Sequence, residues 1–251
     1  MSAVELKNLS LRIGTKQILS NIDVSINPGE TLVLMGKNGS GKTMLLKTLV
    51  GLFKPQEGTA SIFSQSVHAM SHHELDRLRQ KIGYVFQKSG LFDSLHVWEN
   101  VIFALRRFHN LSEAELRDKA TECLNRSGLK EVEDKYPSEL SGGMQKRAGI
   151  ARAIAMDPQL LLLDDPTAGL DPVLTDAIAD LIIDIQKRLG STAIIVAHDF
   201  KLAYKLADRI GLMVGGRLHG VVSRDEFKTT TEPYFEQFRE GKLVGPIPVI
   251  E

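Results

Sequence analysis

The chain has 251 residues, of which 43% are apolar and 25% charged, and its 31 Lys and Arg balance its 31 Asp and Glu. This size and composition fit one large α/β domain with an ordinary globular core. The even charge and the lack of a long basic run argue against a protein that grips many nucleic-acid phosphates. We therefore expect no nucleic-acid partner.

The chain has one cysteine, Cys123, so no disulfide can form within it and a reducing compartment is the simplest interpretation. Its place in a helical pattern predicts a small core residue. The N-terminal residues lack the basic and apolar regions of a secretory signal, and no apolar run approaches the ~20 residues that span a bilayer. If the protein works at a membrane, we expect another chain to supply the span.

The first part of the chain has the pattern of strands. Apolar and polar residues alternate over residues 4–13 and 22–26, which predicts antiparallel strands. A short apolar strand at residues 31–35 leads into a glycine-rich loop and a helix over about residues 41–51. Another strand is predicted at residues 82–86.

Residues 90–155 are predicted to be helical. Residues 97–108 have helical periodicity, and Ser112 with Glu115 forms a capping box at the start of the next helix. A third helix is expected to start after Ser141 and to run to Ala155. We interpret this segment as a helical subdomain inserted into an α/β core.

The pattern then returns to strands that alternate with helices. Residues 160–163 and 192–197 form apolar strands, and a long helix is predicted to start at Asp171-Pro172. Residues 210–223 are expected to form a hairpin across Gly215-Gly216. The spaced prolines of the tail at residues 245–250 predict an extended segment.

The glycine-rich loop fits the pattern G-x-x-x-x-G-K-[ST] at every fixed position, with the residues Gly36, Lys37, Asn38, Gly39, Ser40, Gly41, Lys42 and Thr43. Glycines let the backbone wrap around phosphates, and the helix that follows adds its positive N-terminal end. In this pattern Lys42 reaches the β- and γ-phosphates, and the Thr43 hydroxyl ligates Mg²⁺. The simpler alternative is a glycine-rich turn that caps a helix.

The apolar strand at residues 160–163 is followed by Asp164. A carboxylate at the end of a buried strand can hold Mg²⁺ beside a phosphate-binding loop. Alone this signal is weak, because buried strands often end in Asp at a turn. After a phosphate-binding loop it indicates a nucleotide site.

The decisive motif is Leu140-Ser141-Gly142-Gly143-Met144-Gln145-Lys146-Arg147, which resembles the signature of ATP-binding-cassette (ABC) ATPases. The resemblance covers almost the whole chain. Ser141, Gly142 and Gly143 lie at a helix start and make a second anion site. Such a site is useful if it faces the γ-phosphate bound by a second copy of the chain. The alternative is a simple helix cap.

The resemblance also assigns roles to residues elsewhere. Gln87 is similar to the glutamine that senses Mg²⁺ and the attacking water, and residues 168–171 resemble the loop that crosses the dimer interface. His198 is similar to the histidine that contacts the γ-phosphate. The resemblance therefore implies an α/β P-loop ABC ATPase with an antiparallel β subdomain and an inserted helical subdomain, and ATP and Mg²⁺ as its cofactors.

Two positions depart from the family pattern. The family usually has Glu after the strand-end Asp, whereas this chain has Asp165, which is one methylene shorter. Either Asp165 serves as a working base, which we favour, or hydrolysis is slow. The family also commonly stacks adenine on an aromatic residue in the early strand, and the matching position here is Ile13. Apolar contact in place of stacking should weaken base selectivity.

Transport is the leading hypothesis for the kind of ABC machine. The segment 91–101 and the ending at residues 236–249 are similar to the ATPases of Mla/Mce-type phospholipid transporters. That resemblance implies a homodimer of motor subunits, integral-membrane permease partners, a lipid-binding protein and a place at the cytoplasmic face of the inner membrane. The alternatives are the ATPase of a small-solute importer and a soluble non-transport ABC ATPase.

The resemblance also gives expected boundaries within a single ABC ATPase domain over residues 1–251. Residues 1–88 and 156–224 are expected to form the α/β core with the β subdomain, and residues 89–155 the helical subdomain. Residues 225–251 are expected to add a C-terminal helix and an extended tail. The apolar residues of segment 89–98 either pack inside the helical subdomain or dock against a permease.

Overall fold

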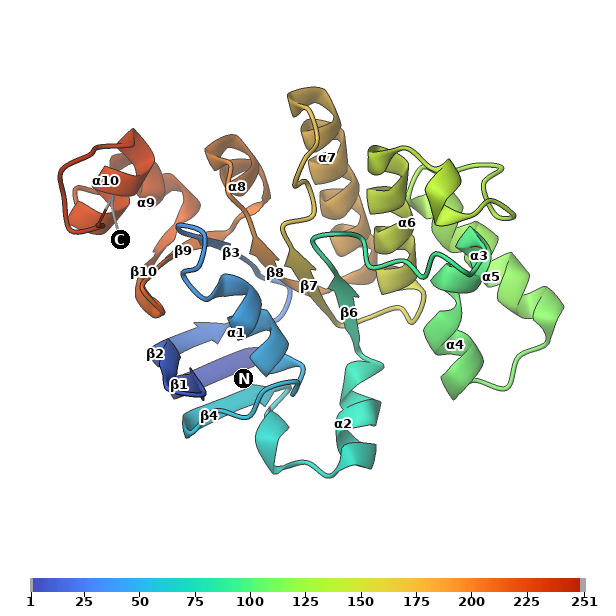
Figure 1. Cartoon of the computed structure of the whole chain (residues 1–251), viewed down its shortest axis with the longest axis horizontal. Coiled ribbons are helices and arrows are strands. Elements are labelled where there is room, and N and C mark those ends of the chain that lie inside the picture. Colours follow the sequence, from blue (N-terminus) through green and yellow to red (C-terminus); the bar gives the residue numbers. More distant parts are fainter. Residues whose placement is uncertain (1, 249–251) are drawn as a thin grey trace. The chain divides into compact units, whose positions relative to one another are not determined.

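The computed structural model describes residues 2–248 and divides into two compact units (Figure 1). The first unit lies within Met1–Leu75 and Ile194–Glu251, and the second is Asp76–Ala193. Within the described residues, no helix combines the length and the apolar character that crossing a membrane requires.

Within the described residues, the first unit contains seven complete strands, four α-helices and one short 3₁₀ helix. They are β1 (Val4–Ile13), β2 (Lys16–Ile26), β3 (Thr31–Met35), α1 (Lys42–Leu49), β4 (Glu57–Ile62), β5 (Gln65–Ser66), η1 (Val67–Ala69), α8 (Phe200–Leu206), β9 (Arg209–Val214), β10 (Arg217–Ser223), α9 (Arg224–Thr229) and α10 (Pro233–Glu240). Two elements, α2 (His72–Arg79) and β8 (Thr192–Val196), begin in one unit and end in the other.

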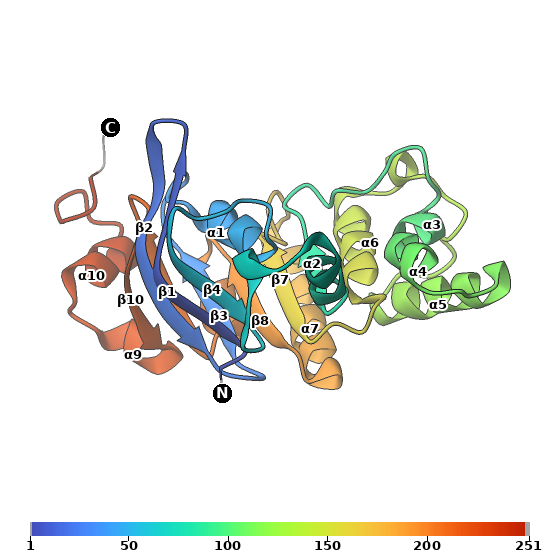
Figure 2. The same ribbon diagram turned by 90° about the horizontal axis from the view of Figure 1, so that it is seen from below.

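The first unit holds the predicted antiparallel sheet, with the strand order β2-β1-β4-β5. Figure 2 shows β1 and β2 as a long hairpin with β4 beside β1. Strand β2 starts at Lys16 and not at residue 22, because its exposed first residues pair across the hairpin with the end of β1. Polar residues at these positions hide the strand pattern in the sequence.

In the first unit, β3 and β9 run parallel, so their carboxyl ends lie at the same edge of the sheet. Strand β3, fully buried, pairs in parallel with β9, and β9 forms the predicted hairpin with β10. The Ala197 amide donates to the Leu34 carbonyl at 3.1 Å, so the chain leaves β8 beside the end of β3. The carboxyl ends of parallel strands are where α/β proteins bind ligands.

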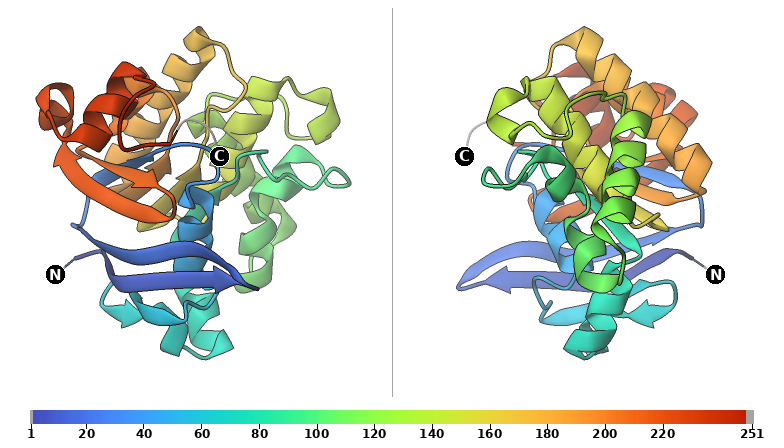
Figure 3. Two further views of the ribbon diagram at one scale, coloured as in Figure 1. Left: turned by 60° about the vertical axis from the view of Figure 1, so that its left-hand side comes forward. Right: turned by 90° about the vertical axis from the view of Figure 1, so that its right-hand side faces the viewer.

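The second unit contains two strands, five helices and a short turn of 3₁₀ helix. They are β6 (Ile82–Val85), α3 (Val97–Val101), α4 (Phe103–Phe108), α5 (Glu113–Arg126), η2 (Pro137–Glu139), α6 (Gly142–Ile154), β7 (Leu160–Asp164) and α7 (Pro172–Leu189), and the end of α2 lies in this unit as well. Strands β6 and β7 pair in parallel. Helix α6 contacts both α3 and α5, in the green and yellow part of Figure 3.

The helical character predicted for residues 97–108 is confirmed, but it is divided between two helices. The structure has two short helices, α3 and α4, separated at Ile102, where φ is −92° and ψ is 8°. That ψ lies far from the −42° of an α-helix, so the chain changes direction there. No glycine or proline marks the break in the sequence.

The C-terminal tail folds back on α10 through a series of bends. The Gln237 side chain accepts from the Ile247 amide at 2.6 Å and donates to the Ile247 carbonyl at 2.9 Å. Ile247 is buried, so one side chain and one apolar contact anchor the tail. The last two residues of the segment predicted to be extended, Val249 and Ile250, lie outside the described residues.

Candidate active site

The glycine-rich loop lies between β3 and α1 in the first unit, and its shape requires glycine. Gly36 has a φ of 140°, and a Cβ there would lie 2.0 Å from the Met213 carbonyl oxygen. Gly41 has a φ of 100°, and a Cβ there would lie 2.8 Å from the Leu19 side chain. A larger residue would collide with β9 or β2, so the loop can pass close to its neighbours only with glycine at these positions.

Lys42 starts α1 and is buried under the loop. Its Nζ donates to the carbonyls of Gly36 at 2.7 Å and Lys37 at 2.8 Å, and to the Ser40 hydroxyl at 3.3 Å. Thr43 follows it in the first turn of α1. A buried ammonium, a hydroxyl and the positive end of a helix make a donor set that fits phosphate oxygens and a cation held by them.

Three further predicted site residues, His198, Lys37 and Ile13, also lie in the first unit. His198 follows β8 and is exposed, at the edge where β8 ends beside β3. Lys37 donates from Nζ to the Pro248 carbonyl at 2.6 Å, so the end of the described tail contacts the loop. Ile13 lies at the end of β1 and is 43% exposed, which leaves its apolar surface open to a ligand.

A second group of predicted site residues, which includes two acids, lies in the second unit. Asp164 ends β7 and Asp165 follows it, both buried. Because β6 runs parallel beside β7, the residues after β6 lie at the same edge. There the Gln87 Nε2 donates to the Asp165 Oδ2 at 3.3 Å, so the structure brings these two predicted residues together.

Tyr84 on β6 faces Asp164, and sequence reasoning did not single it out. Burial, and then the nearby Asp164 carboxylate, raise the pKa of Tyr84, so the phenol stays protonated. Its buried hydroxyl has no partner in hydrogen-bonding geometry among the described residues. A neutral donor next to a carboxylate is suited to hold that carboxylate or a water bound by it.

Lys146 on α6 is the second residue whose role sequence reasoning missed. It is 7% exposed, and its Nζ donates to the Gln87 carbonyl at 2.5 Å. Burial lowers the pKa of Lys146, while the charges of Asp165 and Asp164 favour its charged form. The sequence feature that could have pointed to Lys146 is a lysine on the buried face of a predicted helix.

The start of α6 is open to another molecule. Ser141 is the N-cap, and its hydroxyl accepts from the Met144 amide at 3.4 Å. A Cβ at Gly142 would meet nothing within 4 Å, and one at Gly143 would only touch Leu174 at 3.5 Å. The first amides of a helix can bind an anion, so the anion site expected here stays a prediction that this open helix start fits.

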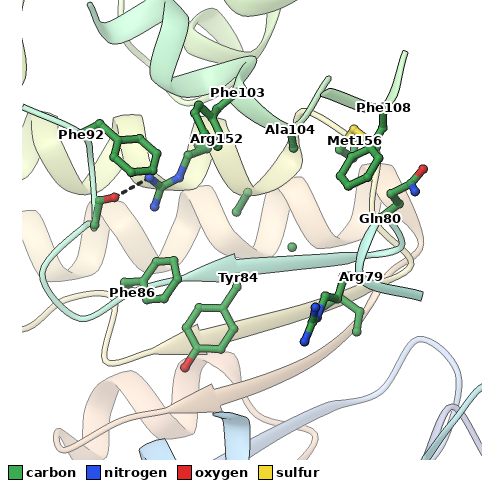
Figure 4. A pocket seen from close by; sticks show the side chains of 14 residues that line it. Arg79, Gln80, Tyr84, Phe86, Phe92, Phe103, Ala104, Phe108, Arg152 and Met156 are labelled. Carbon is green, nitrogen blue, oxygen red and sulfur yellow. Dashed lines mark hydrogen bonds between the residues drawn. The ribbon is translucent and has the colours of Figure 1, made fainter. Parts of the chain in front are cut away.

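An aromatic cavity of about 520 Å³ lies beside the segment that follows Gln87 (Figure 4). It is lined by Arg79, Gln80, Ile82, Gly83, Tyr84, Phe86, Gly90, Phe92, Phe103, Ala104, Phe108, Arg152, Ala153 and Met156. Phe92 and Phe103 lie 4.7 Å apart between ring centroids and are both exposed. Val97, in contrast, is fully buried. The segment 89–98 therefore both packs inside the unit and lines an open cavity.

Comparisons with known proteins point to one family. The family profile described as "ABC transporter" matches residues 19–168. The probable ribonucleotide transport ATP-binding protein mkl of Mycobacterium leprae is 38% identical over 99% of this chain and 72% of its own. The arginine transport ATP-binding protein ArtP of Haemophilus influenzae is 39% identical over 94% and 98%.

Two further similarities are informative. The Arabidopsis thaliana protein TRIGALACTOSYLDIACYLGLYCEROL 3, chloroplastic, is 36% identical over 97% of this chain and 75% of its own. Among solved structures, a dimeric post-hydrolysis state of the ATP-binding cassette MJ0796, bound to ADP and Pi, has a TM-score of 0.81. It is 34% identical and covers 88% of this chain and 98% of its own.

Proposed function

The chain belongs to the ABC transporter family and is an ATPase whose hydrolysis of ATP is coupled to transport, and from this premise we propose that it drives the movement of phospholipid. The fold class that the sequence predicts, an α/β ABC ATPase with an antiparallel sheet and a helical part, is confirmed. The finer proposal concerns the cargo, the partners and the role of each residue.

One relative supports the proposal that the cargo is a lipid. The Arabidopsis protein bears the name of a lipid built on diacylglycerol and matches 97% of this chain. The resemblance of segment 91–101 and of the C-terminal residues to Mla/Mce-type ATPases agrees with it. The relatives named for ribonucleotide and arginine transport favour the alternative, a motor of a small-solute importer.

The hydrolysis mechanism assigns each residue one task. The amides of residues 36–43 and the Lys42 ammonium bind the β- and γ-phosphates, and Ile13 contacts the base. Thr43, Asp164 and Gln87 hold Mg²⁺, which when bound neutralises charge on the γ-phosphate. Asp165 accepts the proton of a water for in-line attack, and His198 stabilises the charge that develops on the γ-phosphate. The donors and acceptors described above support this assignment.

Two copies of the chain are proposed to work together. Ser141, Gly142 and Gly143 of one copy close on the γ-phosphate held by the other, which the open start of α6 supports. The dimeric structure of the similar cassette MJ0796 supports the same arrangement. Closing and opening of the dimer would then move the membrane partner.

A permease helix is proposed to dock in the aromatic cavity beside residues 86–92. Exposed phenylalanines at the mouth of a cavity are typical of a surface that a partner covers. The chain would thereby lie at the cytoplasmic face of the inner membrane, with a lipid-binding protein as a further partner of the permease.

The test is a gentle detergent purification of the tagged chain from its own membranes, followed by mass spectrometry of proteins and lipids. We expect a permease, a lipid-binding protein and bound phospholipid, with ATPase activity that Lys42→Ala abolishes. A permease with a soluble solute-binding protein and no phospholipid would replace the lipid proposal by the importer. Full ATPase activity in Lys42→Ala would overturn the mechanism, since that variant removes the ammonium under the loop.

A further inference from the structure

Helix α6 holds the segment after Gln87 through one face. Lys146, Gly149 and Arg152 are spaced three residues apart, so they share a side of the helix. The Arg152 guanidinium donates to the carbonyls of Gly90 at 2.5 Å and Ser89 at 2.7 Å. At Gly149 an added Cβ would come within 3.3 Å of the Ser89 oxygen, so helix and segment approach closely.

The segment that α6 holds is a tight turn with an unfavourable backbone. Ser89 has a φ of 58° and Gly90 a φ of 64°, and the Ser89 amide donates to the Phe86 carbonyl at 2.9 Å. A left-handed conformation at a residue such as serine persists only where its surroundings impose it. The bonds from Arg152 supply that restraint at the far end of the turn.

Lys146 restrains the near end, at Gln87 itself. Its Nζ donates to the Gln87 carbonyl at 2.5 Å, and the Gln87 amide group in turn reaches Asp165 at 3.3 Å. Gln87 is exposed, so little else packs against its side chain. The main-chain bond from Lys146 therefore fixes the point from which the Gln87 side chain extends toward the acid.

A purely structural role does not need a lysine at this position. Burying an ammonium costs more than burying an apolar side chain of similar size, and Gly149 and Arg152 already join α6 to the turn. What Lys146 adds is one hydrogen bond to the main chain of Gln87 and a positive charge near Asp165 and Asp164. Both act on residues of the candidate site.

We propose that Lys146 is a positioning residue for ATP hydrolysis, which holds Gln87 in the arrangement that places its amide against Asp165. The proposal rests on the ATPase function above and adds a residue to it. The hydrogen bond of Lys146 goes to Gln87, so we expect its effect to fall on the chemical step. A misplacement of about 1 Å in a positioning group can cost on the order of a hundredfold in rate.

The experiment compares steady-state ATP hydrolysis by the full chain and by Lys146→Met, Lys146→Arg and Lys119→Met. We expect Lys146→Met to lower kcat by at least about tenfold while KM for ATP stays within about threefold. Lys146→Arg keeps a long cationic donor and should recover most of kcat. Lys119 is a half-buried lysine of the same unit that bonds Asp157, so Lys119→Met is the matched control and should keep kcat.

Several results would overturn the proposal. One is a kcat within twofold of the wild type in Lys146→Met; another is a fall in kcat that only matches a loss of folded chain by circular dichroism. Equal losses in Lys146→Arg and Lys146→Met would also count against it. If Lys146→Met does not fold, Lys146→Gln, one atom shorter and uncharged, carries the same expectation. A wild-type chain without ATPase activity would instead overturn the proposed function itself.

Discussion

Asp165 combines an unusual backbone with a short carboxylate. Its φ is 50°, a left-handed conformation that aspartate tolerates better than most residues because its short side chain bonds locally. The Gln87 amide lies 3.3 Å from its Oδ2. The site therefore fits the length of aspartate, which favours a working base over an impaired one.

We predict that Asp165→Glu does not raise kcat for ATP hydrolysis, because the extra methylene moves the carboxylate out of its bond with Gln87. Asp165→Asn removes the proton acceptor and should lower kcat by about a hundredfold or more. Steady-state assays at saturating ATP would measure both. A rise of tenfold in Asp165→Glu would mean that the natural chain is a slow enzyme.

At the residue scale, the sequence predicts the residues whose chemistry demands a fixed spacing. Phosphate binding requires glycines, a lysine and a hydroxyl close together, so residues 36–43 could be recognised; residues 36–41 lie between β3 and α1, and Lys42 and Thr43 begin α1. Lys146 and Tyr84 could not be assigned a role, because their neighbours Gln87 and Asp164 are far along the chain. Only folding brings such pairs together.

At the scale of single elements, helix α5 offers a test of its cap. The Ser112 hydroxyl accepts from the Glu115 amide, and the Glu115 carboxylate accepts from the Ser112 amide at 2.8 Å. We predict that Ser112→Ala lowers the free energy of unfolding by about 1 kcal/mol, because both bonds of the cap are weakened. Urea denaturation would measure it, with Ser138→Ala, an exposed serine that caps no helix, as the control.

Because of the same cap, we expect the free energy of unfolding to decrease as the pH falls. The bonds from Ser112 hold the pKa of Glu115 below its usual range. A carboxyl with a lowered pKa in the folded state contributes stability above its unfolded pKa and loses it as the pH falls through the folded one. The difference between wild type and Ser112→Ala should therefore shrink in acid, and a difference unchanged at pH 3 would contradict the cap.

Element ends that depend on local signals could be predicted, and those that depend on distant partners could not. The capping box of α5 and the N-cap of α7 at Asp171 are where the sequence places them. The early start of β2 depends on pairing with β1, and no glycine or proline marks the break at Ile102. Neither feature could be predicted from the local sequence pattern.

At the scale of the whole molecule, the order of the motifs predicted the fold because each motif needs its own strand, loop and helix. The cargo could not be predicted in the same way. Every assigned residue handles phosphate, metal or water, so the sequence of the motor carries little of the chemistry of what is moved.

The tail provides a prediction at the same scale. Truncation after Gly241 leaves the buried Gln237 amide without its partners at Ile247 and Lys242. The truncation also removes the buried Ile247 side chain, so packing and hydrogen bonds are lost together and the melting temperature should fall. We also expect weaker dimer formation by sedimentation. Truncation after Pro248 keeps these contacts and is the control; if both truncations melt alike, the anchor at Gln237 does not matter.

Cys123 is fully buried in α5, and burial raises the pKa of its thiol to about 11. At pH 7 only about one such thiol in ten thousand is then ionised, and the thiolate is the form that reacts. It is also the single cysteine of the chain. A cysteine introduced at the surface would thus be the one site that maleimide dyes reach, and pairs of chromophores could follow the cycle of the motor in real time without first removing a native thiol.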